Sequence, residues 1–127
     1  QEQKSFVATF LAAAGVAIEV DESLQDAITA TSGSGPAYFF AFVEAMVDGA
    51  VALGLNRDDA TALTIQTIVG AAELLKSSGD SPTTLREKVT SPNGTTAAAL
   101  ASFSHDQLSD VVARAMKAAQ LRSQELA

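Results

Sequence analysis

Apolar residues recur at helical spacing along most of the chain, and turn-forming residues separate the runs. Residues 4–14 have the pattern of one helix, which Gly15 ends. The following run, residues 16–20, alternates in polarity and is rich in β-branched residues, so it predicts one short strand. A single strand is not stable alone, and this chain supplies no second strand to pair with it.

From residue 21 onward every pattern predicts a helix. The predicted helices cover residues 21–31, 36–53, 57–76, 82–88, 96–103 and 105–125. Asp21 or Ser23 is expected to cap the first of them, because a short polar side chain can accept a hydrogen bond from a free N–H there. Pro36 and Pro82 suit a first helical turn, and a glycine follows residue 53 where that helix should end. The predicted fold class is therefore all-α, after one helix and one strand.

Two further helix starts are predicted from capping residues. Asn56 precedes the helix at 57–76, and acidic residues occupy its first turn, where the helix dipole favours them. Ser104 and Gln107 have the spacing of a capping box, which predicts that the last helix begins directly after Ser104. His105, the single histidine, is then expected on the surface at that helix start.

The helices at 36–53 and 57–76 are apolar on nearly all sides, whereas a surface helix keeps a polar stripe. A membrane hairpin is disfavoured, because Glu44 and Asp48 would lie near the bilayer centre at about 2.5–3.5 kcal/mol each. We expect instead a homodimer in which the helices of two copies cover each other, since one small domain has little surface to bury both. Small residues at 49–50 and 70–72 would allow close approach.

Composition and charge exclude several classes of function. The net charge is −7 with only eight scattered basic residues, which argues against a nucleic-acid binder. Without cysteine there is no thiolate metal site, no other cluster has metal-ligand spacing, and one histidine gives no credible Ser-His-Asp triad. Glu44 and Asp48 could act as acid and base, but a polar stripe is the commoner reason for such a pair. No signal peptide is evident, and a cytoplasmic location is expected.

Two polar segments are candidates for chemistry. Ser32, Gly33, Ser34 and Gly35 precede Pro36, but they lack the third glycine and the preceding strand of a dinucleotide fingerprint. They could present backbone N–H groups to an anion or cofactor, or they could only connect two helices.

The second polar segment is residues 89–96, "VTSPNGTT". Its proline fixes one φ angle, and Asn93 and Gly94 tolerate positive φ, so a tight turn is expected. Such a turn can direct several N–H groups, with the hydroxyls of Ser91, Thr95 and Thr96, into a nest for a carboxylate. A turn followed by an ordinary helix cap is the other interpretation that the residues allow.

Four segments resemble the Δ1-pyrroline-5-carboxylate reductase family, in that family's order and spacing. They are "DAITATSGSGPAYFF" at 26–40, "ALGLNRDDA" at 52–60, "LREKVTSPNGTT" at 85–96 and "RSQEL" at 122–126. The family has two glycines after the Ser-Pro pair, whereas this chain has Asn93 and then Gly94. Because asparagine tolerates positive φ, the shape of the loop is expected to persist.

The resemblance implies a two-part enzyme that reduces 1-pyrroline-5-carboxylate to L-proline with NADPH or NADH, the last step of proline biosynthesis. Residues 1–20 would be the last helix and strand of a Rossmann domain. Residues 21–127 would be an all-helical dimerisation and substrate-binding domain, of the kind that ends 6-phosphogluconate dehydrogenase. The chain alone is expected to dimerise, with any higher assembly left open, and to lack reductase activity.

The resemblance also implies roles for single residues. Ser91, Gly94 and Thr95 would bind the substrate carboxylate, and Asn93 would belong to the same substrate-binding loop. Thr96 would bind the same substrate and act on its imine nitrogen as the catalytic residue. Residues 32–35 would lie near the nicotinamide side of the cleft.

Two alternatives to this interpretation remain open. One is a helical dimerisation module with no substrate site, and the other is the helical domain of a different imine or hydroxyacid reductase.

Overall fold

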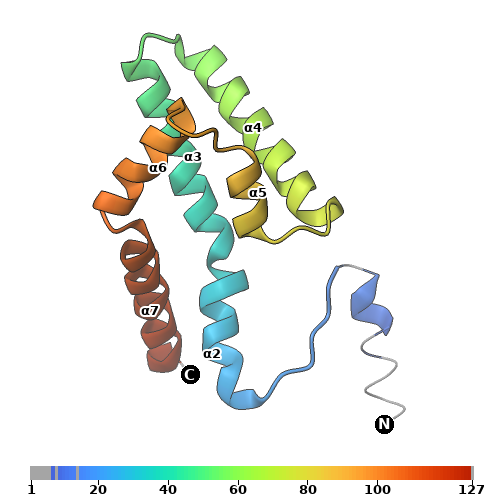
Figure 1. Cartoon of the computed structure of the whole chain (residues 1–127). Coiled ribbons are helices and arrows are strands. Elements are labelled where there is room, and N and C mark those ends of the chain that lie inside the picture. The colour runs from blue at the N-terminus through green and yellow to red at the C-terminus, as the bar shows by residue number, and fades with distance from the viewer. Residues whose placement is uncertain (1–6, 8, 14, 127) are drawn as a thin grey trace.

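The computed structural model describes residues 7, 9–13 and 15–126, and the regular elements within them are helical (Figure 1). This confirms the all-α fold class. In chain order the elements are a 3-10 turn (Glu22–Leu24), α2 (Gln25–Ile28), the π-helix η2 (Thr29–Gly33), α3 (Gly35–Ala52), α4 (Arg57–Ser77), α5 (Pro82–Lys88), α6 (Thr95–His105) and α7 (Leu108–Leu126).

The N-terminal segment differs from its prediction. Residues 7 and 9–12 are helical, as expected, and the other residues of the predicted helix at 4–14 lie outside the described residues or, at 13, form a turn. The predicted strand at 16–20 was wrong, because these residues belong to neither a helix nor a strand and run as a long connection toward α2 (Figure 1). A β-ladder needs a second strand, and the described part of the chain offers none.

Asp21 is the N-cap, as predicted, of a helical segment that then continues almost without a break into α3. Its carboxylate accepts hydrogen bonds from the backbone N–H of Ser23 at 3.1 Å and from the hydroxyl of Ser23 at 2.9 Å. These two bonds favour the charged form and lower the pKa of Asp21. The predicted break at residues 32–36 was wrong, since only Ser34, itself in a right-handed helical conformation, separates η2 from α3.

Helices α3 and α4 pack against each other as an antiparallel pair joined by a short turn (Figure 1). Gly54 takes a φ of 105° there, and Asn56 caps α4 as predicted by accepting a hydrogen bond from the N–H of Asp59 at 2.9 Å. An ion pair of 2.9 Å between Arg57 and Asp48 also joins the two helices. Asp48 is thus an exposed partner of an arginine, which favours the polar-stripe interpretation over an acid-base role.

The last two helices meet at a different point from the one predicted. The capping box at Ser104 was wrong, because Ser104 and His105 form the last turn of α6 and α7 begins only at Leu108. Gln107 makes the corner with a φ of 57°, and its N–H donates to the carbonyl of Ser104 at 3.1 Å. Ser104 therefore lies at the C-terminal end of α6, where its backbone carbonyl accepts a hydrogen bond, and does not cap the start of α7. The side chain of His105 is exposed, as predicted.

One copy of the chain buries very little. Among the described residues only Ala30, Val47 and Ala60 are buried hydrophobic side chains. The accessible surface is 10140 Å² for 13.0 kDa, whereas a compact monomer of that mass would expose about 6,300 Å². Large apolar side chains remain exposed on α3, α4 and α7, although no described helix is both long enough and apolar enough to cross a membrane.

Candidate functional site

Residues 91–94 form a tight turn that leads into α6. The N–H of Gly94 donates to the carbonyl of Ser91 at 3.0 Å, and Asn93, the third residue of the turn, has a φ of 59°. Proline second and a positive φ third are the features of a type II turn. The expected turn and the expected conformation of Asn93 are confirmed, whereas Gly94 itself has a φ of −81°.

Gly94 is required at its position by space rather than by its φ angle. A Cβ atom on Gly94 would lie 3.1 Å from the carbonyl oxygen of Ser91 and 3.4 Å from the Cβ of Ser91. That oxygen is the acceptor of the turn's own hydrogen bond, so it cannot move away without weakening the turn. The turn therefore needs a residue that tolerates positive φ at 93 and a residue without a side chain at 94.

Three hydroxyl groups around this turn have no partner within the described part of the chain. They belong to Ser91, Thr95 and Thr96, of which Thr96 is half-buried. Several hydroxyls inside helices instead donate to the carbonyl one turn earlier, as Thr61 does to Arg57 at 2.7 Å. The hydroxyls at this turn are thus available to a ligand.

The N-terminus of α6 adds backbone donors to these hydroxyls. Gly94 is the N-cap residue and makes no side-chain cap, so Thr95, Thr96 and Ala97 begin the helix with N–H groups that have no helical acceptor. The helix dipole places partial positive charge at the same end. Free N–H groups and hydroxyls at one helix end form an arrangement that suits a carboxylate.

A hollow of about 650 Å³ lies beside the turn, between α5, α6 and the start of α7. Thr90 and Ala97 line it on the side of the turn, with Arg86 from α5 and Gln107 from the corner before α7. Ser91 and Thr96 do not belong to its lining, so the free hydroxyls face a different side of the turn.

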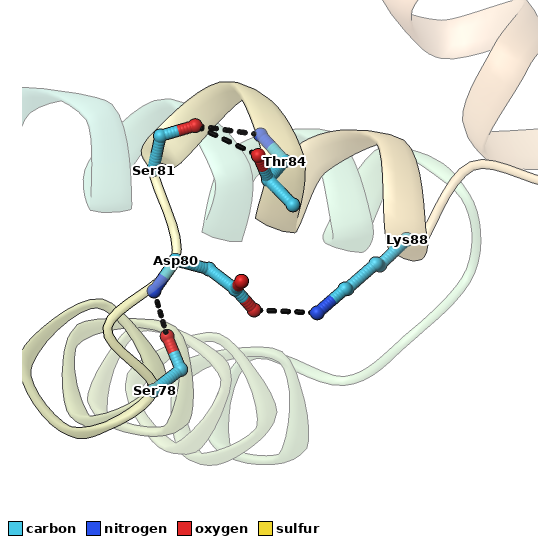
Figure 2. A network of polar contacts seen from close by, with 5 residues as sticks. All are labelled: Ser78, Asp80, Ser81, Thr84 and Lys88. Atoms are coloured by element: carbon cyan, nitrogen blue, oxygen red, sulfur yellow. Dashed lines mark hydrogen bonds and ion pairs between the residues drawn. The ribbon is translucent and has the colours of Figure 1, made fainter.

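A polar network fixes α5, the helix that precedes the turn (Figure 2). Ser81 caps α5 by accepting a hydrogen bond from the N–H of Thr84 at 3.1 Å. The N–H of Asp80 donates to the hydroxyl of Ser78 at 3.2 Å, and Lys88 reaches back from the far end of α5 to the carboxylate of Asp80 at 2.5 Å. The network thus joins both ends of α5 to the end of α4.

The other predicted segment, residues 32–35, has a different geometry. In η2 the N–H of Ser34 donates to the carbonyl of Thr29 at 2.8 Å, one residue earlier than an α-helix would place the acceptor. In an α-helix the N–H of Ser34 would donate to the carbonyl of Ala30, a buried residue. Here the hydroxyl of Tyr38 donates to that carbonyl at 2.9 Å. Tyr38 therefore satisfies an acceptor that the π-helical register deprives of its usual donor.

These contacts leave residues 32–35 poorly suited to hold a phosphate group. The hydroxyl of Ser32 donates to the carbonyl of Ile28 at 3.1 Å, and the N–H of Ser34 is already bonded to Thr29. A Cβ on Gly33 would meet only a methyl group at 3.7 Å, so the glycine lines no close cradle. The N–H of Ser34 is therefore not free for an anion, and a place for residues 32–35 near the nicotinamide stays a prediction. Ser32 does line a hollow of about 810 Å³ between α2 and the N-terminal segment.

The two predicted segments do not come together within one copy of the chain. Figure 1 draws η2 at the foot of α3 and the start of α6 well above it. Among the described residues, no group of three or more histidine, cysteine or acidic side chains could hold a metal ion. Sequence reasoning missed the Tyr38 and Lys88 contacts, which join residues eight apart and follow no helical or capping spacing.

Comparison with known proteins gives a consistent family. The model of the family described as "Pyrroline-5-carboxylate reductase dimerisation" matches residues 22–126. A pyrroline-5-carboxylate reductase from Pseudomonas aeruginosa is 51% identical over 118 residues, covering 92% of this chain and 43% of the relative. One from Arabidopsis thaliana is 41% identical over 126 residues, covering 99% of this chain and 46% of the relative.

Solved structures with the same fold agree with this result. A reductase from Coxiella burnetii superposes with a TM-score of 0.95 at 38% identity, covering 100% of this chain and 47% of that chain. The Plasmodium falciparum enzyme, whose structure has NADP bound, gives a TM-score of 0.87 at 34% identity, with 98% and 50% covered. The chain spans about half the length of the relatives it matches.

Proposed function

We propose, since this chain belongs to the pyrroline-5-carboxylate reductase dimerisation family, that it is the dimerisation and substrate-binding part of an enzyme that reduces 1-pyrroline-5-carboxylate to L-proline. The observation that carries the proposal is the set of unpartnered hydroxyls at the turn before α6. The resemblance assigns the substrate to these same residues, and their hydrogen-bonding capacity is free for it.

The substrate has two groups that this turn can recognise, a carboxylate and a ring imine. In the proposal, the hydroxyl of Ser91 and the hydroxyl and N–H of Thr95 donate to the carboxylate, at the positive end of the α6 dipole. Gly94, whose N–H is bonded to the Ser91 carbonyl, contributes by holding the turn and leaving the start of α6 uncovered. Asn93 contributes by holding the left-handed conformation that brings these donors to one side. Charge-assisted bonds of this kind fix the orientation of the ring before any reaction.

Thr96 is the proposed catalytic residue, through a hydrogen bond between its hydroxyl and the ring nitrogen. Reduction adds hydride to the carbon of the C=N bond, and the nitrogen must hold a proton to become an amine. A threonine hydroxyl is too weak an acid to supply that proton alone, so it orients the nitrogen or relays a proton from water.

A nicotinamide nucleotide, NADPH or NADH, supplies the hydride when bound. Residues 32–35 form no phosphate cradle, so we assign them no role in holding the phosphates. Ser32 remains a proposed contact on the nicotinamide side of the cleft, because it lines the hollow that faces the N-terminal segment.

We further propose a homodimer formed by the apolar faces of α3 and α4. These faces include Phe39, Phe40 and Met46 on α3 and Leu63 and Val69 on α4, all of which are at least 40% exposed. Added Cβ atoms at Gly49 and Gly70 would meet nothing within 4 Å, so these small residues face space outside their own chain.

The substrate site is tested by thermal stabilisation with L-proline, the proposed product. We expect the unfolding midpoint to rise with proline concentration, because proline at one hundred times its dissociation constant would add about 2.7 kcal/mol to the free energy of unfolding. Thr96→Ala and Ser91→Ala should remove this rise, and Thr96→Ser should restore part of it. Thr61→Ala is the matched control, because its hydroxyl is bonded within α4 to the carbonyl of Arg57 at 2.7 Å. If proline does not stabilise the unsubstituted chain, a dimerisation module without a substrate site is the better description.

A further inference from the structure

The ion pair between Asp80 and Lys88 lies close to the turn that follows α5. Lys88 is the last residue of α5, and Ser91 begins the turn only three residues later. The orientation of this seven-residue helix therefore decides where Ser91 lies. Within the described chain α5 packs against α4 alone, so its own apolar contacts restrain it weakly.

We infer that Asp80 and Lys88 are positioning residues for the substrate turn, an inference that rests on the proposed function of that turn. The ion pair spans the length of α5, from the residue before its cap to its last turn (Figure 2). The N–H of Asp80 is itself bonded to Ser78, the C-cap residue of α4, so the end of α4, the start of α5 and the end of α5 form one connected unit.

The connection continues from Lys88 into the turn. The N–H of Thr90 donates to the carbonyl of Glu87 at 3.1 Å, and the hydroxyl of Thr90 donates to the carbonyl of Arg86. The two residues after α5 are therefore coupled to its last turn. A loosened α5 would leave the donors of the turn in several arrangements, and ligand binding would then have to order them.

The side chains are exposed enough that the pair is not needed for the core. Lys88 is 61% exposed and Asp80 30%, and isolated pairs of this kind contribute little to global stability. A positioning role predicts a local effect that exceeds any global effect. The matched control is the ion pair of Arg122 with Glu125 on α7, which is 2.8 Å long and 66% and 63% exposed.

Hydrogen exchange on the 127-residue chain tests the role of the Asp80–Lys88 ion pair without any assay of activity. Asp80→Asn and Lys88→Met should speed exchange of the N–H groups of Gly94 and Ala98 by about threefold, the size expected for losing an exposed pair, with the unfolding midpoint unchanged. The exchanged-charge variant Asp80→Lys with Lys88→Asp should restore slow exchange, and Arg122→Met should leave it unaltered. Unchanged exchange in both single variants would overturn the inference.

Kinetics of the complete reductase give the second measurement. The single variants should raise KM for the pyrroline carboxylate by about threefold, with kcat and KM for the nucleotide unchanged, because only ordering of the turn is affected. Equal effects on all three constants would contradict a positioning role. If the unsubstituted enzyme cannot reduce the substrate, the proposed function is wrong. The hydrogen-exchange result would still test whether the ion pair between Asp80 and Lys88 orders the turn.

Discussion

The two glycine-containing polar segments of this chain, residues 32–35 and residues 91–96, look alike in sequence and differ in what they leave available. The first continues a helix, where the hydroxyl of Ser32 and the N–H of Ser34 both bond to carbonyls of their own helix. The second makes a true turn, and the hydroxyls of Ser91, Thr95 and Thr96 find no acceptor within the described chain.

Composition is therefore a weaker guide to a binding segment than whether its hydroxyl and N–H groups are already hydrogen-bonded within the chain. A polar residue inside a helix readily bonds back to the preceding turn, and this removes it from recognition. A glycine that relieves crowding at a helix start, as Gly94 does, leaves the first N–H groups uncovered. Substitutions at four positions test this contrast, and they are given in order of decreasing effect.

Replacing a glycine by alanine should separate the two segments most clearly. Gly94→Ala places a Cβ 3.1 Å from the Ser91 carbonyl and should lower the free energy of unfolding by about 2 kcal/mol, with loss of stabilisation by proline. Gly33→Ala is the matched change, and it should raise stability by about 0.5 kcal/mol because helical alanine is favoured over glycine. Urea unfolding at one protein concentration measures both, and equal effects would remove the distinction.

Tyr38→Phe tests the helical segment alone. It leaves the buried carbonyl of Ala30 without the tyrosine donor, so the free energy of unfolding should fall by about 1.5 kcal/mol. Stabilisation by proline should persist, because the turn before α6 keeps its contacts. A variant as stable as the unsubstituted chain would mean that the π-helical register does not depend on this bond.

Asn93 carries the smallest expected effect. Asn93→Gly should change the free energy of unfolding by less than about 0.5 kcal/mol and preserve the response to proline, because glycine accepts a φ of 59° freely. Asn93→Ala should cost about 1 kcal/mol, since alanine disfavours the left-handed region. If alanine were tolerated as well as glycine, the conformation at this position would not matter.

Much of the fold could be predicted from the sequence, because its helices carry local signals. Asn56 and Ser81 cap the helices that they precede, and Gly54 and Gly79 take positive φ where helices end. The turn at 91–94 was predictable for the same reason, since proline and asparagine restrict their own backbone angles.

The errors occurred where another interaction, nearby in the chain or between helices, overrides a single local signal. Ser104 has capping-box spacing, yet it continues α6, whose Ala97, Ala98, Ala99 and Ala101 favour helix strongly. Residues 32–35 look like a helix breaker, yet the helix continues through them, where the bond from Tyr38 satisfies Ala30. No spacing rule joins Asp80 with Lys88 either, because their contact depends on how α5 lies along the end of α4.

Because one copy has almost no buried core, subunits should not exchange between dimers as folded monomers. Folding and association would be a single event, so the melting temperature should climb as the chain is concentrated. Two differently tagged populations, once assembled, could then form mixed pairs only by unfolding, and the rate of that mixing would measure the lifetime of the native state.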